Sequence, residues 1–158
     1  STRYSSSAAS DVYKRQARRD HWLKLIKPNL EQGIWVISDR FADSSIVYQG
    51  YAGDIELDTV LNIHNVVLGE VWPDLTIVLD LPPELGLERS NKRDTANNSK
   101  DTRFEKRELQ FHKLLREGFQ YLQSKSPDRI CVVDGTKTIV EVELEVFSII
   151  KKRFVGLM

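Results

Sequence analysis

Residues 34–50 read IWVISDRFADSSIVYQG, an apolar run that stops abruptly at Asp39 and Arg40 and continues into serines, a tyrosine and a glutamine. The continuous apolarity of residues 34–38 predicts a buried strand, because alternation is lost when both faces of a parallel sheet are covered. A solvated turn would explain an acid and a base at this point. The alternative is that the strand delivers Asp39 and Arg40 to a functional cleft.

Two later stretches repeat this pattern of an apolar strand that ends in an acid. Residues 75–81 read LTIVLDL and contain Asp80, and residues 129–134 read RICVVD and end at Asp134. Helical patterns fall between and around the predicted strands, over 17–32, from Ser44, over 57–68, from Pro82 to about Ser90, over about 104–123 and over about 138–154. Strands alternating with helices predict an α/β domain with a doubly wound parallel sheet and helices on both faces. Ligands of such sheets bind at the carboxyl ends of the strands.

Composition narrows the classes of function. The chain has 158 residues, 41% of them hydrophobic, which is enough to bury a core in one soluble domain. Lys plus Arg and Asp plus Glu both number 23, so bulk charge gives no reason to expect a nucleic acid polymer or a membrane as partner. The single cysteine, Cys131, lies in an apolar run and suits a packed side chain in a reducing cytoplasm.

The first 16 residues differ from the rest of the chain. They read STRYSSSAASDVYKRQ, are rich in serine and alanine, and have no hydrophobic period. Helical patterning begins at Ala17. We therefore expect residues 1–16 to be a disordered or non-native tail and residues 17–158 to form the domain.

The segment 91–103, NKRDTANNSKDTR, has no apolar residue larger than alanine and so lacks an anchor to a core. A solvated loop is the simpler interpretation. The functional interpretation is a mobile basic flap that closes over phosphate groups. Its cations, with one from the preceding helix, are Arg89, Lys92, Arg93, Lys100 and Arg103.

Polar groups suited to a nucleotide follow the strand 34–38. An arginine at a strand end can bind a phosphate with two charged hydrogen bonds, and a neighbouring carboxylate can hold Mg²⁺. Hydroxyl and amide groups that suit a base and a sugar come within about one helical turn. They are Ser44, Ser45, Tyr48 and Gln49.

Four stretches together resemble the central and C-terminal parts of bacterial thymidylate kinases, in order and at suitable spacing. They are WVISDRFADSSIVYQG, VLGEVWPDLTIVLDLPPELGLERS, RFEKRELQFHKLLREGF and VVDGT. The resemblance covers about residues 17–154. It implies a P-loop kinase-like fold, a nucleoside monophosphate kinase domain, and phosphoryl transfer from ATP to dTMP with Mg²⁺. The product, dTDP, is a precursor of dTTP.

The resemblance also implies roles for individual residues. Arg18 matches the arginine that faces the thymine base, and Arg40 matches the one that binds the dTMP phosphate. Asp39 serves the metal or holds the phosphate-binding geometry. Ser45 falls where a polar residue contacts the pyrimidine edge, and Tyr48 where a tyrosine encloses the deoxyribose. The expected substrate-binding set also includes Ser44 and Gln49.

The flap arginines Arg89, Arg93 and Arg103, with Lys92, match the region that closes over the phosphates. The expected catalytic set is Asp39, Arg40, Arg93 and Arg103. Thr102 separates Asp101 from Arg103, which are adjacent in the family pattern, so the arginine that acts in transfer stays open.

Two features depart from the family. The loop G-x-x-x-x-G-K-[ST], whose backbone N–H groups hold ATP phosphates, is absent from the sequence. Lys14 stands where the family has an aromatic residue that stacks on thymine. We therefore expect a fragment that lacks N-terminal strands and is inactive alone, and a complete protein that is a cytoplasmic homodimer. Another deoxynucleoside or nucleotide kinase, and a catalytically dead nucleotide-binding module, are the alternatives.

Overall fold

The computed structural model describes residues 17–93 and 102–155, with the side chains of residues 91–107 outside the description. The chain divides into two compact units, residues 1–72 and residues 73–158, and each is considered separately. The expectation of a tail over residues 1–16 lies outside the described residues. Among the described residues, no helix is long and apolar enough to cross a membrane.

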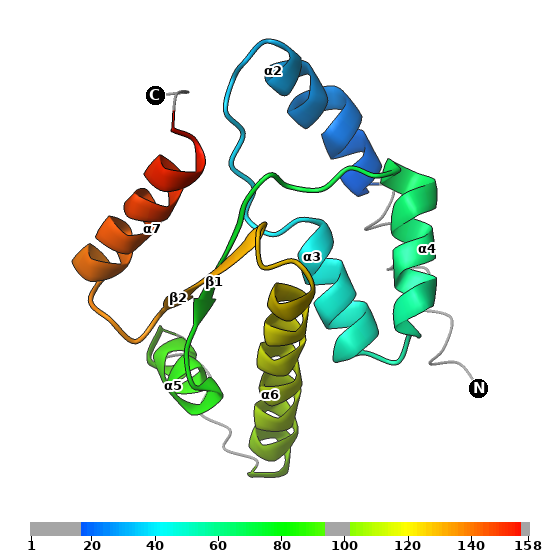
Figure 1. The fold of residues 1–158 in the computed structure, drawn as a ribbon. Coiled ribbons are helices and arrows are strands. Elements are labelled where there is room, and N and C mark those ends of the chain that lie inside the picture. The colour runs from blue at the N-terminus through cyan, green and yellow to red at the C-terminus, as the bar shows by residue number, and fades with distance from the viewer. Residues whose placement is uncertain (1–16, 94–101, 156–158) are drawn as a thin grey trace. The chain divides into compact units, whose positions relative to one another are not determined.

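The first unit is helical (Figure 1). Residues 17–21 are helical and lead into the π-helix η1 (Trp22–Ile26) and then α2 (Lys27–Glu31). The change of helix type lies just before Pro28, which has no N–H to donate. Gly33 ends this helical region with a φ of 74°, a conformation that glycine adopts without steric cost, in agreement with the helical pattern over residues 17–32.

A second helical segment follows Arg40 and contains the core of the first unit. It consists of α3 (Ala42–Ser45) and the π-helix η2 (Ile46–Tyr51), and it packs against α4 (Leu57–Leu68). Ala42, Ile46 and Val47 are at most 2% exposed. His64 of α4 is buried, with its ring centroid 4.0 Å from that of Trp72.

The strand predicted over residues 34–38 is wrong for this structure. No strand is assigned there, and Ile37 is 94% exposed. Within the described ranges, the assigned sheet contains two strands, β1 (Thr76–Asp80) and β2 (Ile130–Asp134), which pair with each other. An apolar run forms a strand only where a neighbouring strand satisfies its backbone groups.

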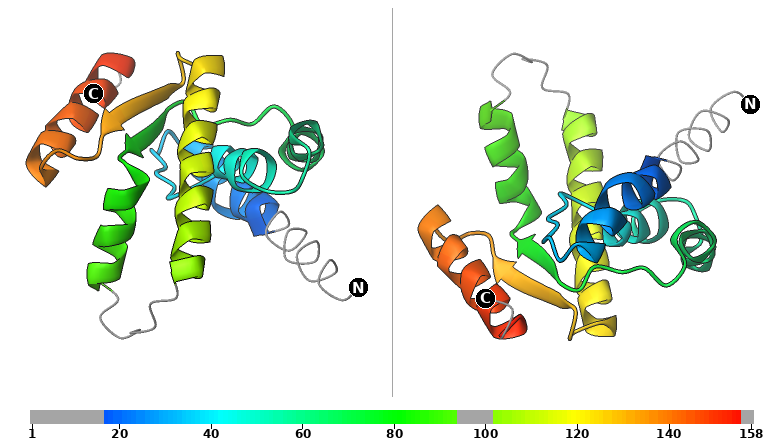
Figure 2. Two further views of the ribbon diagram at one scale, coloured as in Figure 1. Left: turned by 90° about the horizontal axis from the view of Figure 1, so that it is seen from below. Right: turned by 90° about the horizontal axis from the view of Figure 1, so that it is seen from above.

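The second unit has the parallel α/β arrangement expected from the sequence. Strand β1 pairs in parallel with β2, with Asp80 opposite Asp134. Three helices accompany the strands: α5 (Pro83–Arg93), α6 (Thr102–Lys125) and α7 (Ile139–Arg153). Helices α6 and α7 both pack on β2 and lie on either side of it in Figures 1 and 2.

The core of the second unit is centred on β2 and α6. Ile130 and Val133 are at most 1% exposed, and Leu115 on α6 is buried. Helix α5 continues to Arg93, so the predicted loop over 91–103 begins three residues too early. The expected flap contacts of Lys92, Arg93, Lys100 and Arg103 concern side chains outside the described set.

Candidate active site

In the first unit, the turn after residues 34–38 holds Arg40 in an unusual backbone conformation. Arg40 has a φ of 67°, the left-handed region that non-glycine residues rarely adopt, and the Ser38 hydroxyl donates to the Arg40 carbonyl oxygen at 3.3 Å. Asp39, the preceding residue, is exposed. Such strained positions occur often at functional sites, so the geometry agrees with a functional Arg40.

The side chain of Arg40 contacts the helical segment that follows it in the sequence. Its guanidinium carbon lies 4.1 Å from the ring centroid of Tyr48, which is a close cation–π arrangement. Tyr48 belongs to η2, one turn beyond Ser45. The structure therefore brings together two residues that the sequence assigned separately to the phosphate and to the sugar.

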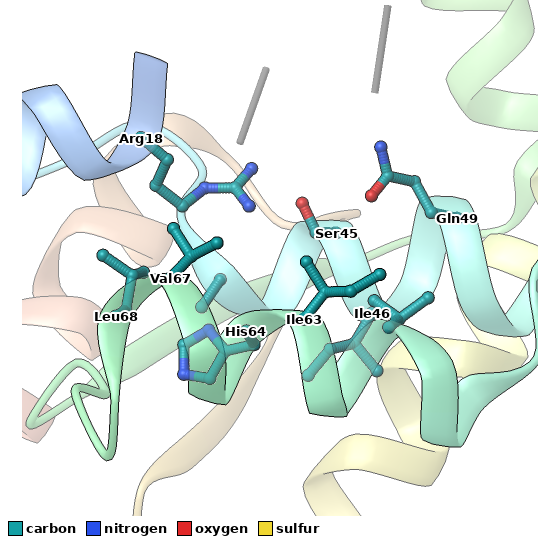
Figure 3. Close-up of a pocket in the computed structure, with 10 residues that line it drawn as sticks. Arg18, Ser45, Ile46, Gln49, Ile63, His64, Val67 and Leu68 are labelled. Atoms are coloured by element: carbon teal, nitrogen blue, oxygen red, sulfur yellow. The ribbon is translucent and has the colours of Figure 1, made fainter. Parts of the chain in front are cut away.

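A second group of predicted residues lines one pocket of the first unit. The pocket is shallow and opens to solvent. Arg18, Ser45 and Gln49 direct their polar ends toward it (Figure 3). The apolar part of the lining comes from α3, η2 and α4 and includes Ala42, Ile46, Ile63 and Val67.

The polar side chains of this pocket offer both hydrogen-bond donors and acceptors. Arg18 offers guanidinium donors, Ser45 a hydroxyl that donates or accepts, and Gln49 an amide that does both. The Arg18 guanidinium also lies 6.0 Å from the centroid of the Phe41 ring. Ser44 is half-buried in α3 and does not line the pocket, so the structure separates it from its neighbour Ser45.

The second unit gathers charged groups at the carboxyl ends of its two strands, where the sequence places Asp80 and Asp134. Asp80 accepts two hydrogen bonds of 2.7 Å from Arg116 of α6, one from Nε and one from a terminal nitrogen. This bidentate pairing raises the pKa of Arg116. Asp80 is thereby committed to an ion pair within its own unit.

The loop after β2 is fixed by backbone bonds. The Gly135 N–H donates to the Asp80 carbonyl oxygen at 2.7 Å, and Arg89 of α5 donates to the Gly135 carbonyl oxygen at 2.9 Å. The carboxylate of Asp134 accepts from both the N–H and the hydroxyl of Thr136, and these bonds lower its pKa. Arg89, which the sequence assigns to the flap, thus joins α5 to the loop after β2.

Sequence reasoning missed Arg116 and its pairing with Asp80. One signal was present. Arg116 lies next to Leu115 and two residues before Gly118, both buried, so a cation interrupts the inward face of the predicted helix. A charged residue in such a place is usually paired.

The Mg²⁺ that the sequence resemblance implies would need few protein ligands. It commonly retains several waters and takes one or two carboxylates together with substrate phosphates. The exposed carboxylate of Asp39 beside Arg40 fits that requirement. Among residues 17–93 and 102–155, no group of three or more His, Cys, Asp or Glu side chains could hold a metal by itself.

Comparison with known proteins gives one consistent family. The sequence model described as thymidylate kinase matches residues 7–146, a range that begins inside the segment 1–16. A thymidylate kinase of Nitrobacter winogradskyi is 41% identical over 138 residues, which are 87% of this chain and 59% of that protein. One of Maridesulfovibrio salexigens is 40% identical over 141 residues, or 88% of this chain and 65% of that protein.

A solved structure gives the same result for the fold. The crystal structure of thymidylate kinase from Ehrlichia chaffeensis superposes with a TM-score of 0.68 at 29% identity, covering 92% of this chain and 65% of that one. The doubly wound α/β fold class expected from the sequence is thus confirmed. The chain spans about three fifths of the length of three curated relatives that it matches.

Proposed function

Because this chain belongs to the thymidylate kinase family, we propose that the complete protein that carries it transfers the terminal phosphoryl group of ATP to dTMP, giving ADP and dTDP. The observation that carries the proposal for this chain is the grouping in the first unit. Arg18, Ser45 and Gln49 share one pocket, and Arg40 lies over Tyr48 in the same unit.

In this proposal the pocket of the first unit receives the thymine base. Arg18 and Ser45 hydrogen-bond the polar edge of the pyrimidine, Gln49 adds an amide contact, and the aliphatic side chains of α4 exclude water from the ring. Tyr48 encloses the deoxyribose, and Ser44 supports the local helix. Arg40 binds the dTMP phosphate through its guanidinium fork.

Phosphoryl transfer depends on positioning and charge neutralisation more than on covalent chemistry. Asp39 holds Mg²⁺, which neutralises phosphate charge when bound. Arg93 and Arg103, with Arg89 and Lys92, supply further positive charge over the transferring group. The complete protein acts as a cytoplasmic homodimer that contributes to dTTP biosynthesis.

The proposal is tested by assaying the complete protein with ATP and each of dTMP, dUMP, AMP and thymidine. We expect the highest kcat/KM for dTMP. Preference for thymidine or AMP would favour another deoxynucleoside or nucleotide kinase. Binding of dTMP without turnover would favour a catalytically dead nucleotide-binding module.

Substitution of Arg40 tests the acceptor site itself. Charged hydrogen bonds contribute about 1.5–3 kcal/mol each, so Arg40→Ala, which removes the two made by the fork, should lower kcat/KM for dTMP by about 10²- to 10⁴-fold. Arg40→Lys should regain little of the lost kcat/KM, because an ammonium group does not reproduce the planar fork of a guanidinium. Arg19→Ala removes an exposed arginine of the same unit and serves as the control. Near-normal kcat/KM in Arg40→Ala would show that the assignment of Arg40 is wrong.

A further inference from the structure

The contact between Arg40 and Tyr48 has a geometry that leaves the hydrogen-bonding edge of Arg40 available. The guanidinium carbon lies 4.1 Å from the Tyr48 ring centroid, which is a distance of stacking. All five N–H donors of a guanidinium lie in its plane and point outward from its rim. When a guanidinium packs with its face on a ring, its donors point sideways, and an anion can accept hydrogen bonds from two of them.

Tyr48 is held more firmly than Arg40. It lies in η2 directly after Ile46 and Val47, which are 2% and 0% exposed, so the backbone below the ring is anchored in the core of the first unit. Arg40 itself is exposed, and its side chain has several rotatable bonds. The ring thus supplies a fixed surface to an otherwise mobile cation.

The backbone at Arg40 directs the side chain toward the ring. Its φ of 67° turns the chain sharply before α3, and the Ser38 hydroxyl, which donates to the Arg40 carbonyl oxygen at 3.3 Å, closes the turn. The Arg18 guanidinium, by comparison, lies 6.0 Å from the Phe41 ring centroid, too far for a similar constraint. Of these two arginines, Arg40 is the one whose orientation a ring can determine.

We propose that the aromatic ring of Tyr48 orients Arg40 for recognition of the acceptor phosphate, so that Tyr48 is a positioning residue as well as part of the sugar site. This inference rests on the proposed function, in which Arg40 binds the phosphate of dTMP. It differs from a pure sugar-enclosing role in one respect. Loss of the ring should weaken binding of the phosphorylated ligand more than binding of the nucleoside, and only while Arg40 is present.

The experiment compares dTMP with thymidine, which has the same base and sugar but no phosphate. Calorimetric Kd values for both ligands are measured with the complete protein and with Tyr48→Leu, Tyr48→Phe, Arg40→Ala and the double variant Tyr48→Leu/Arg40→Ala. Tyr51→Leu removes another tyrosine of η2, 38% exposed, and is the matched control. Thermal melting of each variant checks that it is folded.

For Tyr48→Leu we expect the affinity for dTMP to fall about 3- to 30-fold more than the affinity for thymidine, the range given by cation–π contacts. Tyr48→Phe should restore the wild-type ratio of the two affinities, because it retains the ring. In the Arg40→Ala background, Tyr48→Leu should reduce both affinities by the same factor.

If Tyr48→Leu weakened dTMP and thymidine binding equally in the protein that retains Arg40, the inference would be overturned. Tyr48 would then only enclose the sugar. A ratio that Tyr48→Phe fails to restore would overturn it too, since the phenol rather than the ring would then be responsible. A wild-type protein that does not bind dTMP would refute the proposed function, which separates that failure from the failure of the inference alone.

Discussion

The ion pair between Asp80 and Arg116 should be a principal stabilising contact of the second unit. It joins the carboxyl end of β1 to α6 through two hydrogen bonds of 2.7 Å, with side-chain exposures of 21% for Asp80 and 38% for Arg116. Fully exposed ion pairs contribute about 0.2–1 kcal/mol, and hydrogen bonds to charged groups about 1.5–3 kcal/mol. Partial exposure places the expected coupling between these ranges, at about 1–2 kcal/mol.

A double-mutant cycle isolates this coupling. Asp80→Ala, Arg116→Ala and the double variant are compared with wild type in the complete protein by urea unfolding. Each single variant should lower the free energy of unfolding by more than the coupling itself, because it leaves a half-buried charge without its partner. For a domain of roughly 150–250 residues, a loss of about 1–2 kcal/mol corresponds to a fall in Tm of about 2–8 °C.

A second ion pair of α6, with α5, offers a matched control. Lys113 of α6 and Glu84 of α5 are 3.3 Å apart, but their side chains are 45% and 57% exposed. The equivalent cycle on this pair should give no resolvable coupling, because solvent and salt screen it. If the coupling between Asp80 and Arg116 were no larger than that of the control, the bidentate geometry would carry no stability and the reasoning would be refuted.

Three further predictions concern the second unit and the chain alone. Gly135→Ala should destabilise the complete protein by about 1–3 kcal/mol, because the added Cβ would lie 3.1 Å from the Asp80 carbonyl oxygen. Gly86→Ala, within α5, should instead stabilise it by a few tenths to about 1 kcal/mol, because the added Cβ would lie 3.8 Å from the Leu81 side chain. Urea unfolding compares the two variants, and equal effects would contradict the steric argument. Hydrogen bonds from Thr138 lower the pKa of Glu141 in the capping box of α7, so the stabilisation that they give is complete above the ordinary glutamate pKa of about 4.3 and is lost as pH falls below it. Glu141→Gln should therefore flatten the dependence of the unfolding free energy on pH below about 5. An unchanged slope would show that Glu141 does not contribute to this dependence. Expressed alone, residues 1–158 should be insoluble or molten, bind a hydrophobic dye, and lack both a cooperative melt and dTMP kinase activity. The reason is that apolar side chains such as Ile37 and Ile139 are 94% and 87% exposed. A sharp two-state melt together with formation of dTDP would disprove this prediction.

Local patterns in the sequence were enough to predict most elements. The apolar period of residues 57–68 predicts α4, and the runs that end at Asp80 and Asp134 predict β1 and β2 with their acids at the same sheet edge. Gly33 marks a helix end for a reason that is local to its own backbone. Such features depend on side-chain period and on the conformational freedom of single residues, which the sequence specifies directly.

The contacts that those elements make depend on the tertiary structure. Residues 34–38 have the composition of a buried strand, yet no strand is assigned to them, because strand formation depends on a neighbouring strand that composition does not reveal. The pairing of Arg116 with Asp80 spans 36 residues of sequence. The stacking of Arg40 on Tyr48 depends on a left-handed turn at a residue other than glycine, which sequence propensity disfavours. Contacts between distant residues are set by how the elements pack. For these contacts the sequence indicated candidate residues but not the residues with which they pair.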